Sequence, residues 1–130
     1  MGTLVYVFDD EESICELMRI VLEGRNYEVG TATDGDKSLK MLLHKKPDIA
    51  IIDIKMPRLN GFELISRMKE NPDLAQVPII VITSLTSDSR RSDKEWKERL
   101  EVQDFISKPF EPLELVERIE KVLGSQKTSQ

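Results

Sequence analysis

The chain has 130 residues, of which 39% are hydrophobic and 33% are charged, and its formal net charge is −5. This length is typical of one globular domain with a single core, and the negative charge argues against electrostatic binding to nucleic acid or to anionic membranes. The apolar runs are too short to span a bilayer, and the first residues lack the pattern of a secretory signal. We therefore expect a single-domain cytoplasmic protein. Because Cys15 is the only cysteine, an internal disulfide and a cysteine-based metal site are excluded.

The first half of the chain alternates between predicted strands and helices. Continuous β-prone runs predict strands buried on both faces, whereas apolar residues spaced three and four apart predict helices. Gly24 and Pro47 predict where the first two helices end. The predicted elements are a strand at residues 4–8, a helix whose apolar residues run from Ile14 to Leu22, a strand at 27–32 and a helix at about 36–44.

The second half continues this alternation and ends in a polar tail. Its elements are a strand at 49–53, a helix at 62–70, a strand at 78–83, a charged helix within 87–100, a short strand at 104–107 and a helix from Pro112 to Leu123. The charged helix has few apolar residues, so we expect Trp96 to anchor it in the core rather than to contact a partner. We expect one domain over residues 1–123 and a flexible tail over residues 124–130.

Five strands alternating with five helices predict a doubly wound α/β domain, in which helices cover both faces of a parallel sheet. Such sheets bind their ligands at the carboxyl ends of the strands, where the strand order reverses. Functional residues are therefore expected among those that end the predicted strands.

Polar residues stand at four of these strand ends. Asp9, Asp10 and Glu11 follow the first strand, Asp53 ends the third, Thr83 and Ser84 end the fourth, and Lys108 follows the fifth. Each group alone has an ordinary explanation, because Asp, Ser and Thr also cap helices and lysine is common at protein surfaces.

Taken together, the strand-end carboxylates would repel one another, so a compensating cation is expected. Hard oxygen ligands suit Mg²⁺, whereas the only histidine, His44, lies in the second predicted helix and disfavours a zinc site. A hydroxyl and a lysine beside the metal would bind an anion such as phosphate. A carboxylate in such a site can also attack phosphorus and form an aspartyl phosphate.

Four stretches, VFDDEES, IAIIDIKMPRLNGFEL, VPIIVITS and DFISKPF, resemble the receiver domains of two-component response regulators. They occur in the family's order, and the resemblance covers the chain from Leu4 to Leu123. It implies a flavodoxin-like fold, with a five-stranded parallel sheet of order 2-1-3-4-5 and five helices. It also implies a phosphorylation-activated signalling switch, whose only reactions are its own phosphorylation and dephosphorylation.

The resemblance implies a role for each strand-end residue. Asp53 would accept a phosphoryl group from a sensor histidine kinase or a histidine phosphotransfer protein. The ligands of Mg²⁺ or Mn²⁺ would be Asp9, Asp10, Asp53 and the backbone carbonyl of Lys55. The remaining roles would be Thr83 as switch hydroxyl, Phe105 as switch aromatic residue, Lys108 as charge partner of the phosphoryl group, and a cis bond between Lys108 and Pro109.

Two residues flank the expected path of the water that hydrolyses the phosphoaspartate. Lys55 lies two residues after Asp53, and Leu85 lies two residues after Thr83. We hypothesise that Lys55 contacts the phosphoryl group and that Leu85 shields it. The phosphoaspartate would then be long-lived.

The output surface is expected on the fourth helix, fifth strand and fifth helix, where a partner protein or an output domain would read it. The residues after Leu123 are too few for an output domain, so the chain acts through a partner or belongs to a longer regulator. We expect a monomer or a phosphorylation-dependent dimer, without direct contact to nucleic acid or membrane.

Two alternative functions stay open at this point. The first is a degenerate receiver that binds a partner without phosphorylation. The second is a phosphatase or phosphotransferase acting on small molecules. Such enzymes commonly have another acid two residues after the nucleophile, and this chain has Lys55 there.

Overall fold

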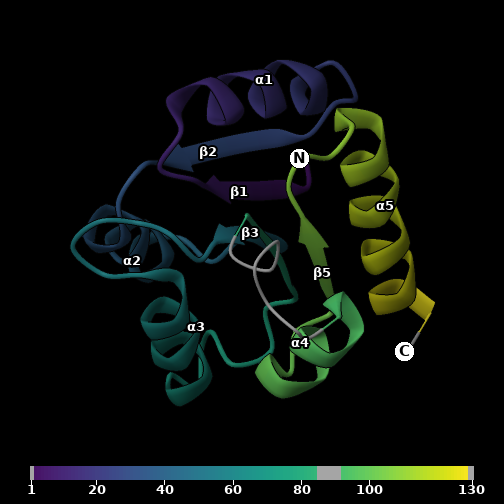
Figure 1. Cartoon of the computed structure of the whole chain (residues 1–130). Coiled ribbons are helices and arrows are strands. Elements are labelled where there is room, and N and C mark those ends of the chain that lie inside the picture. The colour runs from purple at the N-terminus through teal and green to yellow at the C-terminus, as the bar shows by residue number, and fades with distance from the viewer. Residues whose placement is uncertain (1, 85–91, 129–130) are drawn as a thin grey trace.

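The computed structural model describes residues 2–84 and 92–128, with side chains up to residue 125. Its centre is a sheet of five parallel strands in the order β2-β1-β3-β4-β5 (Figure 1). The strands are β1 (Leu4–Phe8), β2 (Glu28–Ala32), β3 (Ile49–Asp53), β4 (Ile79–Thr83) and β5 (Asp104–Ser107). The strand order and the parallel pairing of all neighbours confirm the expected flavodoxin-like fold.

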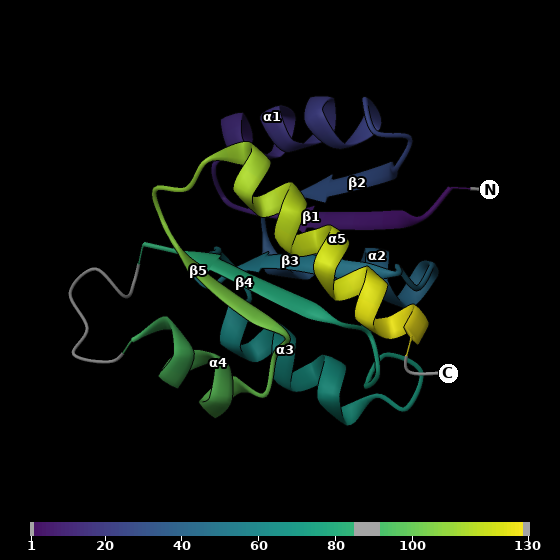
Figure 2. The same ribbon diagram turned by 90° about the vertical axis from the view of Figure 1, so that its right-hand side faces the viewer.

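Five helices cover the two faces of the sheet. They are α1 (Glu12–Glu23), α2 (Gly35–His44), α3 (Gly61–Glu70), α4 (Asp93–Leu100) and α5 (Pro112–Thr128). Helices α1 and α5 pack on one face, and α2, α3 and α4 pack on the other (Figure 2). Because side chains alternate along each strand, each face of the sheet has its own apolar core. Among the described residues, no helix is both long enough and apolar enough to cross a membrane.

The inner strands β1, β3 and β4 are apolar along most of their length because helices cover both of their faces. Every residue in these three strands is buried. Polar residues enter the buried region at the carboxyl ends, where Asp53 closes β3, Thr83 closes β4 and Asp9 follows β1. A buried polar group is unfavourable unless it has a partner, so this edge is where a functional site is expected.

Some helix ends differ from the sequence prediction. Helix α5 continues past Leu123 to Thr128, so the backbone of residues 124–128 is helical where a flexible tail was expected. A glycine inside a helix costs only about 1 kcal/mol relative to alanine, which explains why Gly124 does not end α5. Helix α4 occupies the later part of the predicted segment 87–100, and residues 85–91 lie outside the described part of the chain.

The N-caps of α1 and α4 are neither the aspartates that follow β1 nor the hydroxyl residues that end β4. Glu11 is the N-cap of α1, and Ser92 is the N-cap of α4, where its side chain accepts a hydrogen bond from the amide of Glu95. The alternative explanation of Asp9 and Thr83 as caps of these two helices is therefore wrong.

Helix α4 is attached to the domain by few apolar contacts. None of its residues from Asp93 to Leu100 is buried. Its main anchor is Trp96, whose ring lies between those of Phe62 and Phe105, at centroid distances of 5.9 and 6.0 Å. The prediction that Trp96 anchors this helix in the core is confirmed.

Candidate functional site

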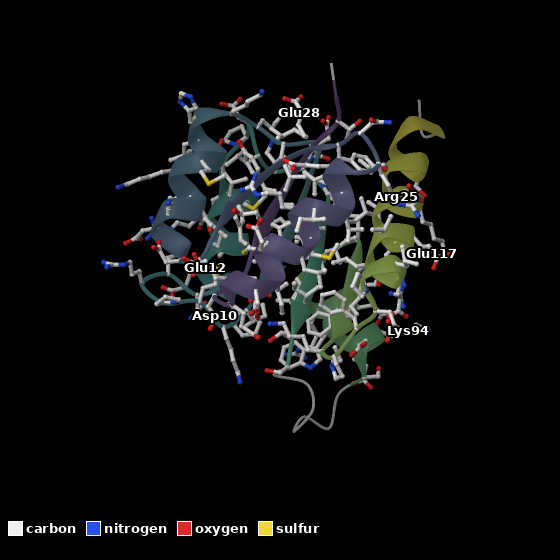
Figure 3. The ribbon with its side chains drawn as sticks, turned by 90° about the horizontal axis from the view of Figure 1, so that it is seen from above. Asp10, Glu12, Arg25, Glu28, Lys94 and Glu117 are labelled. Carbon is white, nitrogen blue, oxygen red and sulfur yellow. The ribbon has the colours of Figure 1, made fainter. Side chains whose placement is uncertain are left out.

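The carboxyl edge of the sheet brings together the polar residues that the sequence analysis singled out. Parallel strands end at the same edge, so residues distant in the sequence become neighbours. In the strand register, Thr83 pairs with Ser107, which directly precedes Lys108. Figure 3 labels Asp10 just before α1, at the opposite end of the molecule from Glu28, the first residue of β2.

Lys108 is the central cation of this edge. Its ammonium nitrogen Nζ lies 3.0 Å from Asp53 Oδ2, 3.0 Å from Asp9 Oδ2 and 2.9 Å from Glu11 Oε1. Only 11% of the Lys108 side chain is exposed, so its ion pairs with the two aspartates are shielded from water. One ammonium group thus faces three carboxylates, and this part of the site keeps an excess of negative charge.

Asp9, Asp10 and Asp53 form an acidic triad. One carboxylate oxygen of each lies within 4.8 Å of the others, with Asp9 and Asp53 buried and Asp10 exposed. Lys108 Nζ donates to Oδ1 of Asp9 at 3.3 Å and lies 3.0 Å from Oδ2, which is buried and accepts no contact of hydrogen-bond geometry in the described part of the chain. Oxygen ligands in this number, with one side open to water, fit Mg²⁺. The residues present therefore suit the expected metal.

Burial shifts the acid–base equilibria of these groups. Desolvation raises the pKa of Asp9 to about 7, although the Glu11 amide and Lys108 act in the opposite direction. The pKa of Asp53 is also raised, because desolvation outweighs the opposing effect of Lys108. For Lys108 itself, burial lowers the pKa, but hydrogen bonds to Glu11, Asp53 and Asp9 outweigh burial, and the pKa is raised. Protons and cations therefore compete for the oxygens of Asp9 near neutral pH.

The loop after β3 positions Asp53. Its Oδ1 accepts a hydrogen bond from the backbone amide of Lys55 at 3.1 Å. A Cβ atom on Gly61 would come within 2.5 Å of the Asp53 carbonyl oxygen and within 2.6 Å of Ile54 Cα. Only glycine therefore lets the start of α3 pack this closely on the end of β3. The side chain of Lys55 is exposed, and the metal-binding role of its carbonyl stays a prediction.

The expected switch residues lie on the two neighbouring strands. Thr83 is fully buried at the end of β4, and its carbonyl accepts a hydrogen bond from the Lys108 amide at 2.9 Å. Phe105 on β5 is 2% exposed and stacks on Trp96 with an interplanar angle of 13°. Phe105 thus faces the core in this structure. Leu85, the other residue expected to tune the phosphoryl lifetime, lies outside the described residues.

Two contacts of this edge were not predicted. Glu11 was recognised as a strand-end acid but was given no role, although it binds Lys108. Asp93, in the first turn of α4, binds Ser107 through both of its carboxylate oxygens. The acidic run DDE could have indicated the first contact. Nothing in the charged segment around Asp93 distinguishes it from its acidic neighbours. The expected cis peptide bond between Lys108 and Pro109 is present.

Comparisons with known sequences agree with this geometry. The sequence profile of the response regulator receiver domain family matches residues 5–120. Response regulator GtcR of Aneurinibacillus migulanus is 41% identical over 123 residues, which make up 95% of this chain and 48% of that protein. The alkaline phosphatase synthesis transcriptional regulatory protein PhoP of Bacillus subtilis is 34% identical over 123 residues, or 95% of this chain and 49% of that protein. The chain thus spans about half the length of these curated relatives.

Solved structures show the same fold over nearly the whole chain. The REC domain of AraT, a response regulator from Geobacillus stearothermophilus, matches with a TM-score of 0.82 and 31% identity, covering 100% of this chain and 99% of that one. A putative response regulator from Chloroflexus aurantiacus matches with a TM-score of 0.83 and 30% identity, covering 95% and 99%. The chemotaxis protein CheY4 of Vibrio cholerae matches with a TM-score of 0.82 and 26% identity, covering 94% and 99%.

Proposed function

This chain belongs to the family of response regulator receiver domains, and from that membership we propose that it is a phosphorylation-activated switch in which Asp53 accepts the phosphoryl group. The observation that supports this most directly is the position of Lys108, which binds Asp53 and Asp9 within the acidic triad. A two-component receiver implies a histidine kinase partner. The donor would be the phosphohistidine of a sensor kinase or of a histidine phosphotransfer protein.

Asp53 would act as the nucleophile of the transfer. Its carboxylate oxygen attacks phosphorus, a phosphorus–oxygen bond forms, and the bond between phosphorus and the donor's imidazole nitrogen breaks. The metal ligands would be Asp9, Asp10, Asp53 and the Lys55 carbonyl. Mg²⁺ or Mn²⁺ bound there would neutralise negative charge on the transferring group.

Lys108 would favour the ionised form of Asp53 before transfer and would bind the phosphoryl group on Asp53 afterwards. Burial alone raises the pKa of Asp53, and the ammonium group 3.0 Å from its Oδ2 lowers it again, which favours the ionised carboxylate. After transfer, the same ammonium group would form charge-assisted hydrogen bonds with phosphoryl oxygens.

The phosphoryl group would reach the output surface through Thr83 and Lys108. It adds charge and acceptor oxygens, which attract the Thr83 hydroxyl and the Lys108 ammonium group. The backbones of these residues are joined by the hydrogen bond from the Lys108 amide to the Thr83 carbonyl, so the ends of β4 and β5 would move together. The surface of α4, β5 and α5 would then change shape, and a partner or an output domain would read it.

The donor protein would approach over α1 and the loop after β5. A groove of about 390 Å³ opens there beside Lys108 and is lined by the mainly apolar residues Ile14, Leu17, Pro109 and Phe110. Leu17 is 44% exposed although it is large and apolar. An apolar surface next to a charged site suits a partner that must place its histidine against Asp53.

Neither alternative function is favoured by a specific observation. A degenerate receiver has no need of a lysine held against two buried aspartates, yet Lys108 makes both contacts. Small-molecule phosphatases commonly have a second acid where the exposed Lys55 stands. The monomeric or phosphorylation-dependent dimeric state, the absence of direct nucleic-acid binding and the cytoplasmic location belong to the same proposal.

The test is phosphorylation by acetyl phosphate, read by intact mass. With Mg²⁺ the protein should gain the mass of one phosphoryl group, and chelation of the metal should prevent the gain. Asp53→Asn, which keeps the size of the side chain, should abolish it, whereas Asp36→Asn on the exposed surface of α2 should not. Absence of the adduct from the unaltered chain, or its persistence in Asp53→Asn, contradicts the proposal.

A further inference from the structure

Strand β5 is an edge strand of the sheet, and the first turn of α4 contacts its last residue, Ser107. The outward backbone groups of an edge strand have no neighbouring strand to bind. At Ser107 the amide donates to Asp93 Oδ2 at 3.3 Å, and the hydroxyl donates to Asp93 Oδ1 at 2.6 Å. Both oxygens of one carboxylate thus bind a single residue of the strand. We call this pair the Asp93–Ser107 clamp.

The clamp lies next to Thr83 and Lys108, the two residues through which the proposed switch would act. Ser107 pairs in register with Thr83 on β4. The next residue, Lys108, extends its side chain to Asp53 and donates its amide to the Thr83 carbonyl. A backbone movement of Thr83 and Lys108 towards Asp53 would therefore act on the strand end that Asp93 holds.

Helix α4 has few other attachments, so the clamp matters for its position. No residue of the helix is buried, and α4 lies beside β5 and α3 in both ribbon views (Figures 1 and 2). Towards its middle, Trp96 stacks on Phe105. At its far end, Lys69 of α3 donates to the carbonyl of Glu101 at 2.7 Å. The clamp joins the first turn of α4 to the strand that precedes Lys108.

We propose that Asp93 is a positioning residue of the switch. Through Ser107, it holds α4 and β5 in the unphosphorylated arrangement and so weakens binding of a phosphoryl group at Asp53. The inference rests on the proposed function, because it concerns the regulation of the same site. Its physical basis is reciprocity: a contact that stabilises the unphosphorylated state lowers the affinity for whatever stabilises the other state, by the same factor.

The coupling is measured by titrating the full chain with beryllofluoride in the presence of Mg²⁺, since beryllofluoride mimics a phosphoryl group on a carboxylate. Fluorine NMR of the bound ligand reports binding, and the emission of Trp96, the only tryptophan, reports the surroundings of α4. Asp93→Ala and Ser107→Ala should each bind beryllofluoride about three- to tenfold more tightly than the unaltered chain, which corresponds to the loss of one typical intramolecular hydrogen bond.

Three controls separate the clamp from other effects. Ser107→Ala removes no charge, so tighter binding in that variant is not electrostatic. Glu98→Ala removes the same charge as Asp93→Ala from an exposed position on α4 and should leave the affinity unchanged. The double variant of Asp93 and Ser107 should bind no more tightly than Asp93→Ala, because that change already removes both hydrogen bonds of the clamp.

A second measurement needs no phosphoryl mimic. In the ligand-free protein, hydrogen exchange at the Ser107 amide should be faster in Asp93→Ala than in Glu98→Ala, because only the first loses the acceptor. Asp93→Asn, which keeps the side-chain shape, serves if the alanine variant folds poorly, and it should give a smaller shift in the same direction.

Each outcome decides the inference. Unchanged or weaker binding in both clamp variants overturns it, and so does an equal tightening in Glu98→Ala. If the unaltered chain is phosphorylated by acetyl phosphate in those cases, the proposed function stands while the clamp inference fails. If the unaltered chain neither binds beryllofluoride nor accepts a phosphoryl group, the proposed function fails and the inference fails with it.

Discussion

Lys108 and Asp9 form a buried ion pair in which one carboxylate oxygen is left without a hydrogen bond. Nζ of Lys108 donates to Oδ1 of Asp9 at 3.3 Å, while Oδ2 lies 3.0 Å from the same nitrogen without hydrogen-bond geometry. The side chain of Lys108 is 11% exposed and that of Asp9 is fully buried. In the metal-free protein, the ammonium group therefore supplies part of the positive charge that a metal ion would supply.

Replacing Lys108 tests how far it stabilises the buried acids. Lys108→Met removes the cation and leaves Asp9 and Asp53 without compensation, and breaking a buried ion pair in this way typically costs about 3–5 kcal/mol. The loss should be larger near pH 8 than near pH 5, because at the lower pH the acids can become neutral by protonation. Urea unfolding of the metal-free protein at pH 5 and at pH 8 measures the loss in the free energy of unfolding at each pH. Lys94→Met, an exposed lysine on α4, is the control (Figure 3), and equal losses for the two variants would contradict the expectation.

The raised pKa of Asp9 predicts how stability depends on pH. Its folded-state value of about 7 lies above the ordinary value of 3.8. Between these two pH values the folded protein binds more protons than the unfolded chain, so stability falls as the pH rises. The raised pKa of Asp53 acts in the same direction. The metal-free protein should therefore resist urea better near pH 5 than near pH 8, and Asp9→Asn should reduce the difference. A rise in stability over this range that is unaffected by Asp9→Asn would contradict the prediction.

Mg²⁺ should reverse this trend. A ligand that binds only the folded state stabilises it by about 2.7 kcal/mol at one hundred times its dissociation constant. Near pH 8 Asp9 is ionised and the gain should be large. Near pH 5 protons occupy Asp9, and the gain should be small. Urea unfolding with Mg²⁺ and with a chelator gives the difference at each pH. An equal gain in Asp9→Asn would show that the metal binds elsewhere.

The fold and the site were predictable from the sequence because both depend on short-range patterns. Apolar runs that alternate with segments of helical periodicity indicate a parallel sheet covered by helices. A parallel sheet places the carboxyl ends of its strands along one edge. Lys108 and Asp53 could therefore be placed at the same edge although 55 residues separate them, and the resemblance to receiver domains assigned them to one site. The convergence follows from topology and does not depend on exact side-chain packing.

Contacts that depend on the orientation of a weakly apolar helix could not be predicted. The segment around α4 contains several acids and bases, and only the position of the helix on β5 selects Asp93 as the partner of Ser107. Similarly, the adjacent residues Asp9 and Asp10 look alike in the sequence, yet one is buried and the other exposed. Neither distinction produces a periodic pattern that a sequence can show.

Gly61 should be required for the position of Asp53. Gly61→Ala would place a Cβ atom 2.5 Å from the Asp53 carbonyl oxygen, so the end of β3 or the start of α3 must shift. Overpacking of this kind typically costs about 1–3 kcal/mol, and phosphorylation by acetyl phosphate should also become slower. Gly124→Ala in α5 is the control, because its Cβ meets nothing within 4 Å. An unchanged phosphorylation rate in Gly61→Ala would show that the site tolerates the shift.

The lifetime of the phosphoaspartate should depend on Lys55 and Leu85. The Lys55 amide already binds Oδ1 of Asp53 at 3.1 Å, and the Lys55 side chain is exposed. We expect this side chain to contact a phosphoryl oxygen on Asp53. Leu85 lies outside the described residues, and its shielding role rests on its place two residues after Thr83. After phosphorylation and removal of acetyl phosphate, decay followed by intact mass should be faster in Lys55→Ala and in Leu85→Ala than in the unaltered chain. Lys55→Arg, which keeps the charge, should decay more slowly than Lys55→Ala. Half-lives unchanged in both alanine variants would reject the hypothesis that these two residues protect the phosphoryl group from water.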